Sequence, residues 1–213
     1  MTPDPIWPNW FGETAIIIAS GPSLKKQDVE MVRGRGKVIA IKKCVEFAPW
    51  ADVVYGCDGP WWRSVQGLKA FKGLKLAYEP TVCGSEYGIQ RVEIPDAKEE
   101  RFLFGKIGVV GSGRNSGFQA VNLAAQFGAK RIILLGFDLQ GETGAHWYGR
   151  NNWMQANNPD QWSYQRWQQA FEFAAPELKA RGIEVINASR NTALKCFRCV
   201  PISDALELAR VAA

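Results

Sequence analysis

The sequence predicts an α/β protein with a mostly parallel sheet and helices on both faces. Three observations lead to this fold class. Residues 14–19 (TAIIIA) and 131–136 (RIILLG) are continuous apolar runs, as expected of strands that are buried on both faces. Residues 116–127 form a segment with helix signals at both ends. Such strands and helices alternate along the chain, which indicates right-handed βαβ units and a parallel sheet.

The apolar runs predict six strands. Each is short and rich in β-branched or aliphatic residues, and most are followed by Gly, Pro or polar residues. They cover residues 14–19, 37–41, 52–55, 74–78, 131–136 and 183–187.

Four helices are expected between or after these strands. One follows Gly21-Pro22-Ser23 and ends at Gly34, and the clearest covers residues 116–127. In the latter, Ser116 and Gln119 have capping-box spacing, and Gly128 suits the position after the last turn. The third covers residues 162–180, where Pro176 kinks or divides it, and the fourth covers residues 203–211.

Two segments have no clear periodicity. Residues 151–161 are expected to form an exposed loop. Residues 80–114, with their Gly, Pro and charged clusters, fit either an insertion or a lid. The chain as a whole, residues 1–213, has the length of one ordinary domain.

Composition excludes some classes of protein. The chain is 46% hydrophobic and 22% charged, as in soluble globular proteins. No apolar run approaches the roughly 20 residues of a membrane helix, and the first residues lack the pattern of a signal peptide. The five cysteines are an odd number, typical of reduced thiols in a cytoplasmic protein. We therefore expect a cytoplasmic protein that does not bind a membrane.

The formal net charge of +5 suits an anionic ligand such as a nucleotide. It supports nucleic-acid binding only weakly, because lysines and arginines are scattered and form no long basic run. Cys196 and Cys199 form a lone CxxC without a second ligand pair, so we expect two packing cysteines and no metal site there.

The turn after the first predicted strand is a candidate phosphate site. It contains Ser20, Gly21, Pro22 and Ser23. A strand-to-helix turn directs backbone N–H groups and the positive end of a helix dipole toward a ligand, and Gly21 allows close approach. The alternative is a plain helix N-terminus, since the turn has neither the Walker A nor the dinucleotide pattern.

The loop before the predicted helix at 116–127 is a second candidate. Asn115, Ser116 and Gly117 could donate hydrogen bonds to an anion at the start of that helix. The glycines at 111, 113 and 117 resemble GxGxxG, but the third is one residue late and no acidic residue follows at the expected distance. NAD binding is therefore excluded.

Three further residues follow predicted strands and could carry chemistry. Asp58 and Asp138 follow the strands at 52–55 and 131–136, where a carboxylate can bind Mg²⁺ or a ribose hydroxyl, or cap a turn. His146 is the only histidine and lies in a Gly-flanked loop. Because the pKa of imidazole lies near neutrality, His146 is a candidate general base, with a structural role as the alternative.

These motifs together resemble a known superfamily. The strand followed by GPSL, the NSG-helix followed by RIILLGFD, and GAHWYG are similar to motifs shared by MptE-like proteins, flagellin-modifying motility-associated factors and Campylobacter-type sialyltransferases. A group of phage and prophage proteins of this length also shares residues 48–62 and 185–197. The resemblance covers nearly the whole chain.

The resemblance implies a Rossmann-like fold that binds a nucleotide or nucleotide sugar at the GPSL turn. From the sialyltransferases it implies donor binding by Ser116 and Gly117 and a general-base role for His146. From the MptE-like enzymes it implies ATP- and Mg²⁺-dependent pyrophosphoryl transfer, with Asp58 and Asp138 as the carboxylates. The chain departs from these patterns at Lys42-Lys43, where the sialyltransferases have an asparagine, and at 146–152, HWYGRNN, where the phage group often has HWHGDHP. The missing second histidine and acid weaken a metal site in this loop.

We therefore expect a phage-type, glycosyltransferase-like transferase in the host cytoplasm, with a nucleotide or nucleotide sugar as ligand and no certain cofactor. One alternative is a Mg²⁺-dependent phosphotransferase of the pyrophosphokinase type that uses ATP. Another is a non-catalytic phage accessory protein that binds a nucleotide, or a host partner through exposed tryptophans. The acceptor, the nucleobase and the oligomeric state stay open.

Overall fold

A computed structural model of the chain describes residues 7–84 and 86–211. Its centre is a single eight-stranded sheet in which all the strands are parallel, in the order β5-β4-β3-β2-β1-β6-β7-β8. The predicted α/β class with a mostly parallel sheet is confirmed. The strands are β1 (Thr14–Ile18), β2 (Lys37–Ile41), β3 (Val53–Tyr55), β4 (Leu74–Ala77), β5 (Ile89–Arg91), β6 (Arg131–Leu135), β7 (Glu184–Asn187) and β8 (Arg198–Cys199).

All six predicted strands are present, and β5 and β8 were not predicted. These two have only three and two residues and lie at the edges of the sheet. So short a strand has no periodicity to detect, and only its pairing with a neighbouring strand defines it.

Five α-helices cover the sheet. They are α1 (Lys26–Met31), α2 (Gly59–Ser64), α3 (Ser116–Gln126), α4 (Gln161–Ala180) and α5 (Ile202–Val211). The short α2 was not predicted, and α1 is shorter than expected at both ends. The helix α4 is not divided at Pro176, which lies inside it and is exposed to solvent. Gly128 follows α3 with φ +95°, as predicted for that position.

The predicted capping box at the start of α3 is wrong. The N-cap is Asn115, whose side chain accepts a hydrogen bond from the Phe118 amide at 3.1 Å. The Gln119 side chain is buried and accepts a hydrogen bond from the Tyr55 hydroxyl at 2.8 Å. The Gln119 side chain is therefore part of the core and does not cap the helix.

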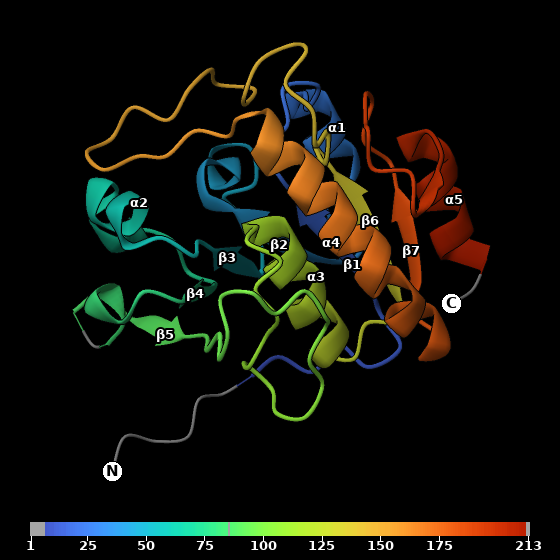
Figure 1. Cartoon of the computed structure of the whole chain (residues 1–213). Helices are drawn as coiled ribbons and strands as arrows, with labels where there is room; N and C mark the ends of the chain where they lie inside the picture. The colour runs from blue at the N-terminus through green and yellow to red at the C-terminus, as the bar shows by residue number, and fades with distance from the viewer. Residues whose placement is uncertain (1–6, 85, 212–213) are drawn as a thin grey trace.

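The helices form a layer on each face of the sheet (Figure 1). Helices α3 and α4 pack on one face, against alternate strand residues such as Ile17 and Ile132. Helices α1, α2 and α5 pack on the other face, against Ile16, Ile133 and their neighbours. Adjacent residues of one strand thus enter opposite cores, which explains the unbroken apolar runs in the sequence.

The chain changes direction across the sheet at β1. Strand β2 lies on one side of β1 and β6 on the other. After β1 the chain continues to α1 on one face, whereas after β6 it continues through a long loop to α4 on the other face. The loops leaving β1 and β6 therefore diverge, which creates a crevice at the carboxyl ends of the strands, the usual ligand position in such sheets.

Residues 92–113 pack against α3 through two buried amides. Asn122 accepts hydrogen bonds from the amides of Leu103 and Gly111 at 2.9 and 3.0 Å, and its own NH₂ donates to the Leu103 carbonyl at 2.8 Å. Gln126 makes three similar bonds to the same segment. Val92, Phe102 and Val110 are fully or almost fully buried, so this segment contributes to the core.

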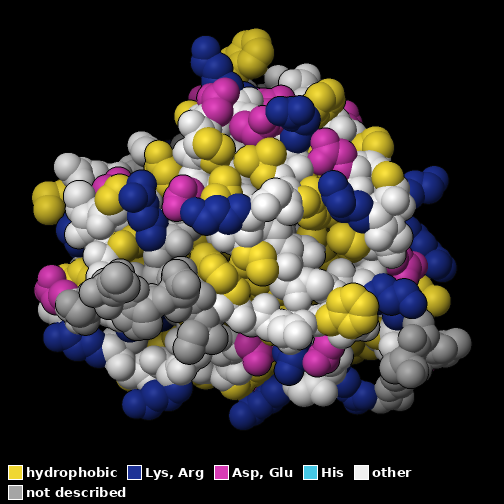
Figure 2. Space-filling view, turned by 90° about the horizontal axis from the view of Figure 1, so that it is seen from below, with side chains coloured by type: hydrophobic (Ala, Val, Ile, Leu, Met, Phe, Trp, Pro, Cys, Tyr) yellow, Lys and Arg dark blue, Asp and Glu magenta, His cyan; other side chains and the backbone are white. Residues whose placement is uncertain are grey.

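The surface carries mixed charge. On the face seen in Figure 2, basic and acidic side chains are interspersed among apolar ones, and neither sign gathers into a single field. No helix in the described ranges has both the length and the apolar character needed to cross a bilayer.

We expect Asn122→Ala to lower the free energy of unfolding by about 3 kcal/mol. The substitution leaves the N–H groups of Leu103 and Gly111 without their acceptor, and each such loss costs roughly 1–3 kcal/mol before relaxation. Urea denaturation measures the effect, with Asn152→Ala at an exposed position as the matched control. Equal stability of the two variants would contradict the structural role given to Asn122.

Candidate functional site

A cavity of about 480 Å³ lies at the carboxyl ends of the central strands. The loops after β1, β2, β3 and β6 form its floor, and the beginnings of α3 and α4 form two of its walls. Nine of the ten site residues predicted from the sequence line it, and Ser23 lies behind them. The nine are Ser20, Gly21, Pro22, Asp58, Asn115, Ser116, Gly117, Asp138 and His146.

Asp138 and Ser23 fix the turn after β1 from behind. The Ser23 amide donates to one carboxylate oxygen of Asp138 and the Ser23 hydroxyl to the other, both at 2.8 Å. Burial raises the pKa of Asp138, and these two bonds lower it. A side chain at Gly21 would collide with the Asp138 carboxylate and with the Gly136 carbonyl. Gly21 is therefore required by the contact between the two loops, and both oxygens of Asp138 have protein partners.

The first turn of α3 directs unpartnered amides at the cavity. Asn115 caps the Phe118 amide, while the amides of Ser116 and Gly117 donate to no acceptor in the described parts of the chain. Gly117 packs on Phe137, because a Cβ atom there would lie 2.7 Å from the Phe137 ring. The helix start is thus held close to the loop after β6, with two N–H groups available to an anion.

Two cations at the cavity have an unfavourable backbone conformation. Lys42 and Arg114 have φ angles of +50° and +51°, and Leu139, which also lines the cavity, has +47°. These are three of six such non-glycine residues in the described chain. Each costs on the order of 1 kcal/mol or more, and such strain is concentrated at functional sites. Lys42 also forms an ion pair with Asp58, which gives that carboxylate a protein partner.

His146 lies between the turn after β1 and the cavity. Its Nδ1 is 2.9 Å from the Ser20 hydroxyl, and its ring stacks on Tyr148 with 4.9 Å between the centroids. Its Nε2 is buried without a hydrogen-bond partner in the described chain. Burial, followed by the positive charge of Lys42, lowers the pKa of His146 to about 4. The ring is therefore neutral at neutral pH, and the tautomer that donates from Nδ1 to Ser20 leaves a lone pair on Nε2.

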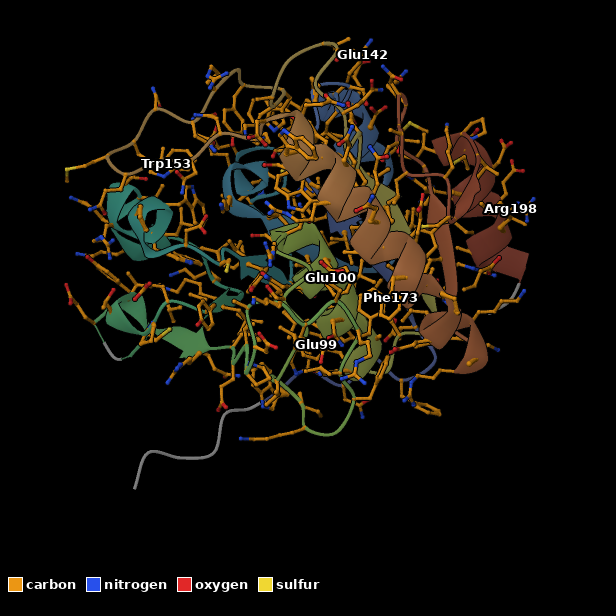
Figure 3. All side chains as sticks on the ribbon, viewed as in Figure 1. Glu99, Glu100, Glu142, Trp153, Phe173 and Arg198 are labelled. Atoms are coloured by element: carbon orange, nitrogen blue, oxygen red, sulfur yellow. The ribbon has the colours of Figure 1, made fainter. Side chains whose placement is uncertain are left out.

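Three asparagines and a tyrosine close the loop that borders the cavity between β6 and α4. The Tyr148 hydroxyl donates to Asn151 at 2.8 Å, and the Asn151 amide donates to the Asn158 side chain at 2.7 Å. Asn151 also donates to the Asn157 carbonyl at 2.6 Å. Trp153, labelled in Figure 3 on this loop, packs against the core cluster that contains Trp61. The loop predicted at 151–161 is thus ordered by its own side chains.

Sequence reasoning missed most of the other residues that line the cavity. Among them are Lys42, Arg114, Tyr164, Arg166 and Trp167. Lys42 directly follows a predicted strand, so its position was a detectable signal. Tyr164 and Trp167 are three residues apart on α4, where an aromatic pair is usually part of the core and gives no separate signal.

The two carboxylates considered for Mg²⁺ have protein partners in this structure. Asp58 is paired with an ammonium group, and both oxygens of Asp138 are bonded to Ser23. No group of three His, Cys, Asp or Glu side chains in residues 7–84 and 86–211 could hold a metal ion. Cys196 and Cys199 are free thiols.

Comparison of the chain with protein-family models, with curated proteins and with solved structures finds no match.

We expect His146 to stay neutral down to about pH 4. Because it is the only histidine, its imidazole signals in a two-dimensional NMR titration need no assignment. The midpoint should lie near 4, well below the ordinary value of 6.5. A midpoint near 6.5 would mean that the ring is not buried as described.

The same shift makes stability depend on pH. Between pH 6.5 and about 4 the unfolded chain binds more protons at this residue than the folded chain does. The free energy of unfolding should therefore fall as the pH is lowered through this range. His146→Gln should reduce that fall, which urea denaturation at several pH values can measure.

Proposed function

We propose that this chain is a glycosyltransferase-like enzyme that binds a nucleotide or nucleotide sugar in the cavity at the β1–β6 crevice. The observation that carries the proposal is the convergence of three features on one cavity. Ser116 and Gly117 at the start of α3, the strained cations Lys42 and Arg114, and the single histidine, His146, all line it. The resemblance to nucleotide-dependent transferases agrees with this assignment.

The donor phosphates would lie at the start of α3. The Ser116 and Gly117 amides would donate to phosphate oxygens, with Asn115 fixing the helix start. Lys42 and Arg114 would supply positive charge from two other loops. Both cations have a positive φ angle, which is energetically unfavourable. Such strain is common at binding sites, where it places a side chain for a ligand.

The chemical step would be displacement at the anomeric carbon of the donor. Nε2 of His146 takes the proton of the acceptor hydroxyl while the acceptor oxygen forms a bond to that carbon. The bond between the carbon and the phosphate oxygen breaks, and the phosphate leaves with the electron pair. Lys42, Arg114 and the α3 amides stabilise the charge that develops on the leaving group.

The low pKa of His146 suits a base that acts only when the donor is present. Burial is the main cause of the depression, and Lys42, Arg150 and Lys43 add to it. Donor phosphates would offset the charge of these cations and so raise the pKa of His146 by the part that the cations contribute. Glycosyl transfer is favoured over Mg²⁺-dependent phosphotransfer because both carboxylate oxygens of Asp138 are already bonded to Ser23.

A thermal-shift panel tests donor binding. It would contain CMP, CDP, UDP, GDP, ADP, ATP and nucleotide sugars, each with and without Mg²⁺. One class should raise the melting temperature, because a ligand that binds only the folded state stabilises it. Lys42→Gln and Arg114→Gln should each weaken that binding roughly 10-fold or more, whereas Lys130→Gln at the opposite end of the sheet should not. A strict need for Mg²⁺ would favour the phosphotransferase, and no shift with any nucleotide would overturn the proposal.

We expect His146→Ala to slow the chemical step about 10²–10⁴-fold and to leave donor affinity nearly unchanged. Slow hydrolysis of the donor, with water as the acceptor, measures the step without knowledge of the natural acceptor. Isothermal titration with the donor supplies the affinity. If His146→Ala weakens donor binding but leaves the hydrolysis rate of the bound donor unchanged, His146 is not the general base.

A further inference from the structure

One part of the cavity lies at the carboxyl end of β4, three strands away from β1. Tyr78, which directly follows β4, lines the cavity there. Ile94 and Ala97, from the segment after β5, line it as well. We call the part of the cavity lined by these three residues the β4 end. Its lining is an aromatic ring and two aliphatic side chains, which suits a flat apolar group.

The Tyr78 side chain is available to a ligand. Two residues earlier, Leu76 enters the core on the α3 face of the sheet, while Ala77 enters the core on the opposite face. Because side chains alternate along a strand, Tyr78 lies on the α3 face, where Ile94 also packs. Tyr78 is only partly buried, and it belongs to neither core cluster of the described residues. Its ring therefore has a free surface, on which a nucleobase can stack.

Asp58 follows the neighbouring strand, β3, and has one carboxylate oxygen available. Its Oδ2 accepts a hydrogen bond from Lys42, whereas its Oδ1 accepts none from the residues that the structure describes. The side chain is 52% exposed and lines the cavity. An ionised carboxylate accepts strong hydrogen bonds from hydroxyl groups such as those of ribose. The Lys42 ammonium offsets the repulsion between this carboxylate and phosphates nearby.

The strand order sets the spacing of these groups. The loops after β2, β3 and β4 supply Lys42, Asp58 and Tyr78 in turn. Neighbouring strands lie about 4.8 Å apart, so the backbones of Lys42 and Tyr78 are separated by about 10 Å. In a nucleotide, the phosphate, the ribose and the base follow one another over a similar length. The cation, the carboxylate and the aromatic ring therefore occur in the order in which a nucleotide would need them.

We infer that the β4 end of the cavity is the subsite for the nucleoside of the donor. The base packs on Tyr78, against Ile94 and Ala97, and Oδ1 of Asp58 accepts hydrogen bonds from the ribose hydroxyls. The phosphates lie at Lys42 and the start of α3, and the transferred group lies on the far side, toward His146. This inference rests on the proposed function for the position of the phosphates, and it deepens that function by fixing the direction of the donor in the cavity.

The first test compares a nucleotide with a probe that lacks the nucleoside. Isothermal titration uses the nucleoside diphosphate that stabilises the protein most and, in parallel, inorganic pyrophosphate. Tyr78→Leu should weaken binding of the nucleotide roughly 10-fold or more, because the stacking surface is lost. Binding of pyrophosphate should stay unchanged. Tyr78→Phe is the matched control, since it keeps the ring and should bind the nucleotide nearly as the wild-type chain does.

The second test concerns the ribose hydroxyls. The wild-type chain should bind the nucleoside diphosphate roughly 10-fold or more tightly than its 2′,3′-dideoxy analogue. Asp58→Ala should abolish this difference, because the acceptor of the two hydroxyls is gone. The ratio of the two affinities is independent of any change in phosphate binding that follows from freeing Lys42. Asp204→Ala, at an exposed position on α5, should keep the difference.

The outcomes separate the two proposals. If Tyr78→Leu and Asp58→Ala bind the nucleotide and its analogue as the wild-type chain does, the nucleoside subsite is wrong and the nucleotide site stands. Equal weakening of nucleotide and pyrophosphate by Tyr78→Leu would show a structural role for the ring and would also overturn the subsite. If both variants act as expected but no nucleotide sugar is turned over, the subsite stands and the transferase fails. If no nucleotide binds, both proposals fail.

Discussion

The hydrogen bonds between Asp138 and Ser23 are the interaction on which the site depends most. Asp138 belongs to the loop after β6 and Ser23 to the loop after β1, and the carboxylate is 1% exposed. The Ser23 hydroxyl also accepts a hydrogen bond from the Asn191 amide at 3.3 Å, in the loop after β7. One buried carboxylate thus holds the turn that carries Ser20, and Ser20 in turn positions His146. A carboxylate that looked catalytic from its place after a strand instead organises the loops around the cavity.

The apolar pattern of the sequence predicted the fold because burial on both faces leaves a strong signal. Strands such as β1 and β6 are apolar at every position that faces a helix layer, so their lengths and places could be recognised. The short α2 has only six residues, including Trp61 and Trp62, and no repeat of the helical period. Gln119 shows a different limit of sequence-based prediction. Its spacing from Ser116 predicts a capping box, but in the structure its side chain accepts a hydrogen bond from Tyr55, which lies far away in the sequence.

The site residues that come directly after a strand could be predicted from the sequence. Most of the predicted residues line the cavity because the carboxyl ends of parallel strands meet at one edge of the sheet. Backbone strain at Lys42 and Arg114 has no local sequence pattern. It arises from how the loops pack against one another, which only three-dimensional structure defines.

The two edges of the sheet limit how this protein can associate. An exposed edge strand is a template for pairing with a strand of another chain, and long, flat apolar edges promote aggregation. Here the edge strands β5 and β8 have three and two residues, and each contains an exposed arginine, Arg91 or Arg198. Edge strands this short offer few unpaired backbone groups, and their arginines disfavour pairing with a strand of a second molecule. Association of this protein with copies of itself would therefore use side chains of its helices and loops. The sheet would not extend from one molecule into the next.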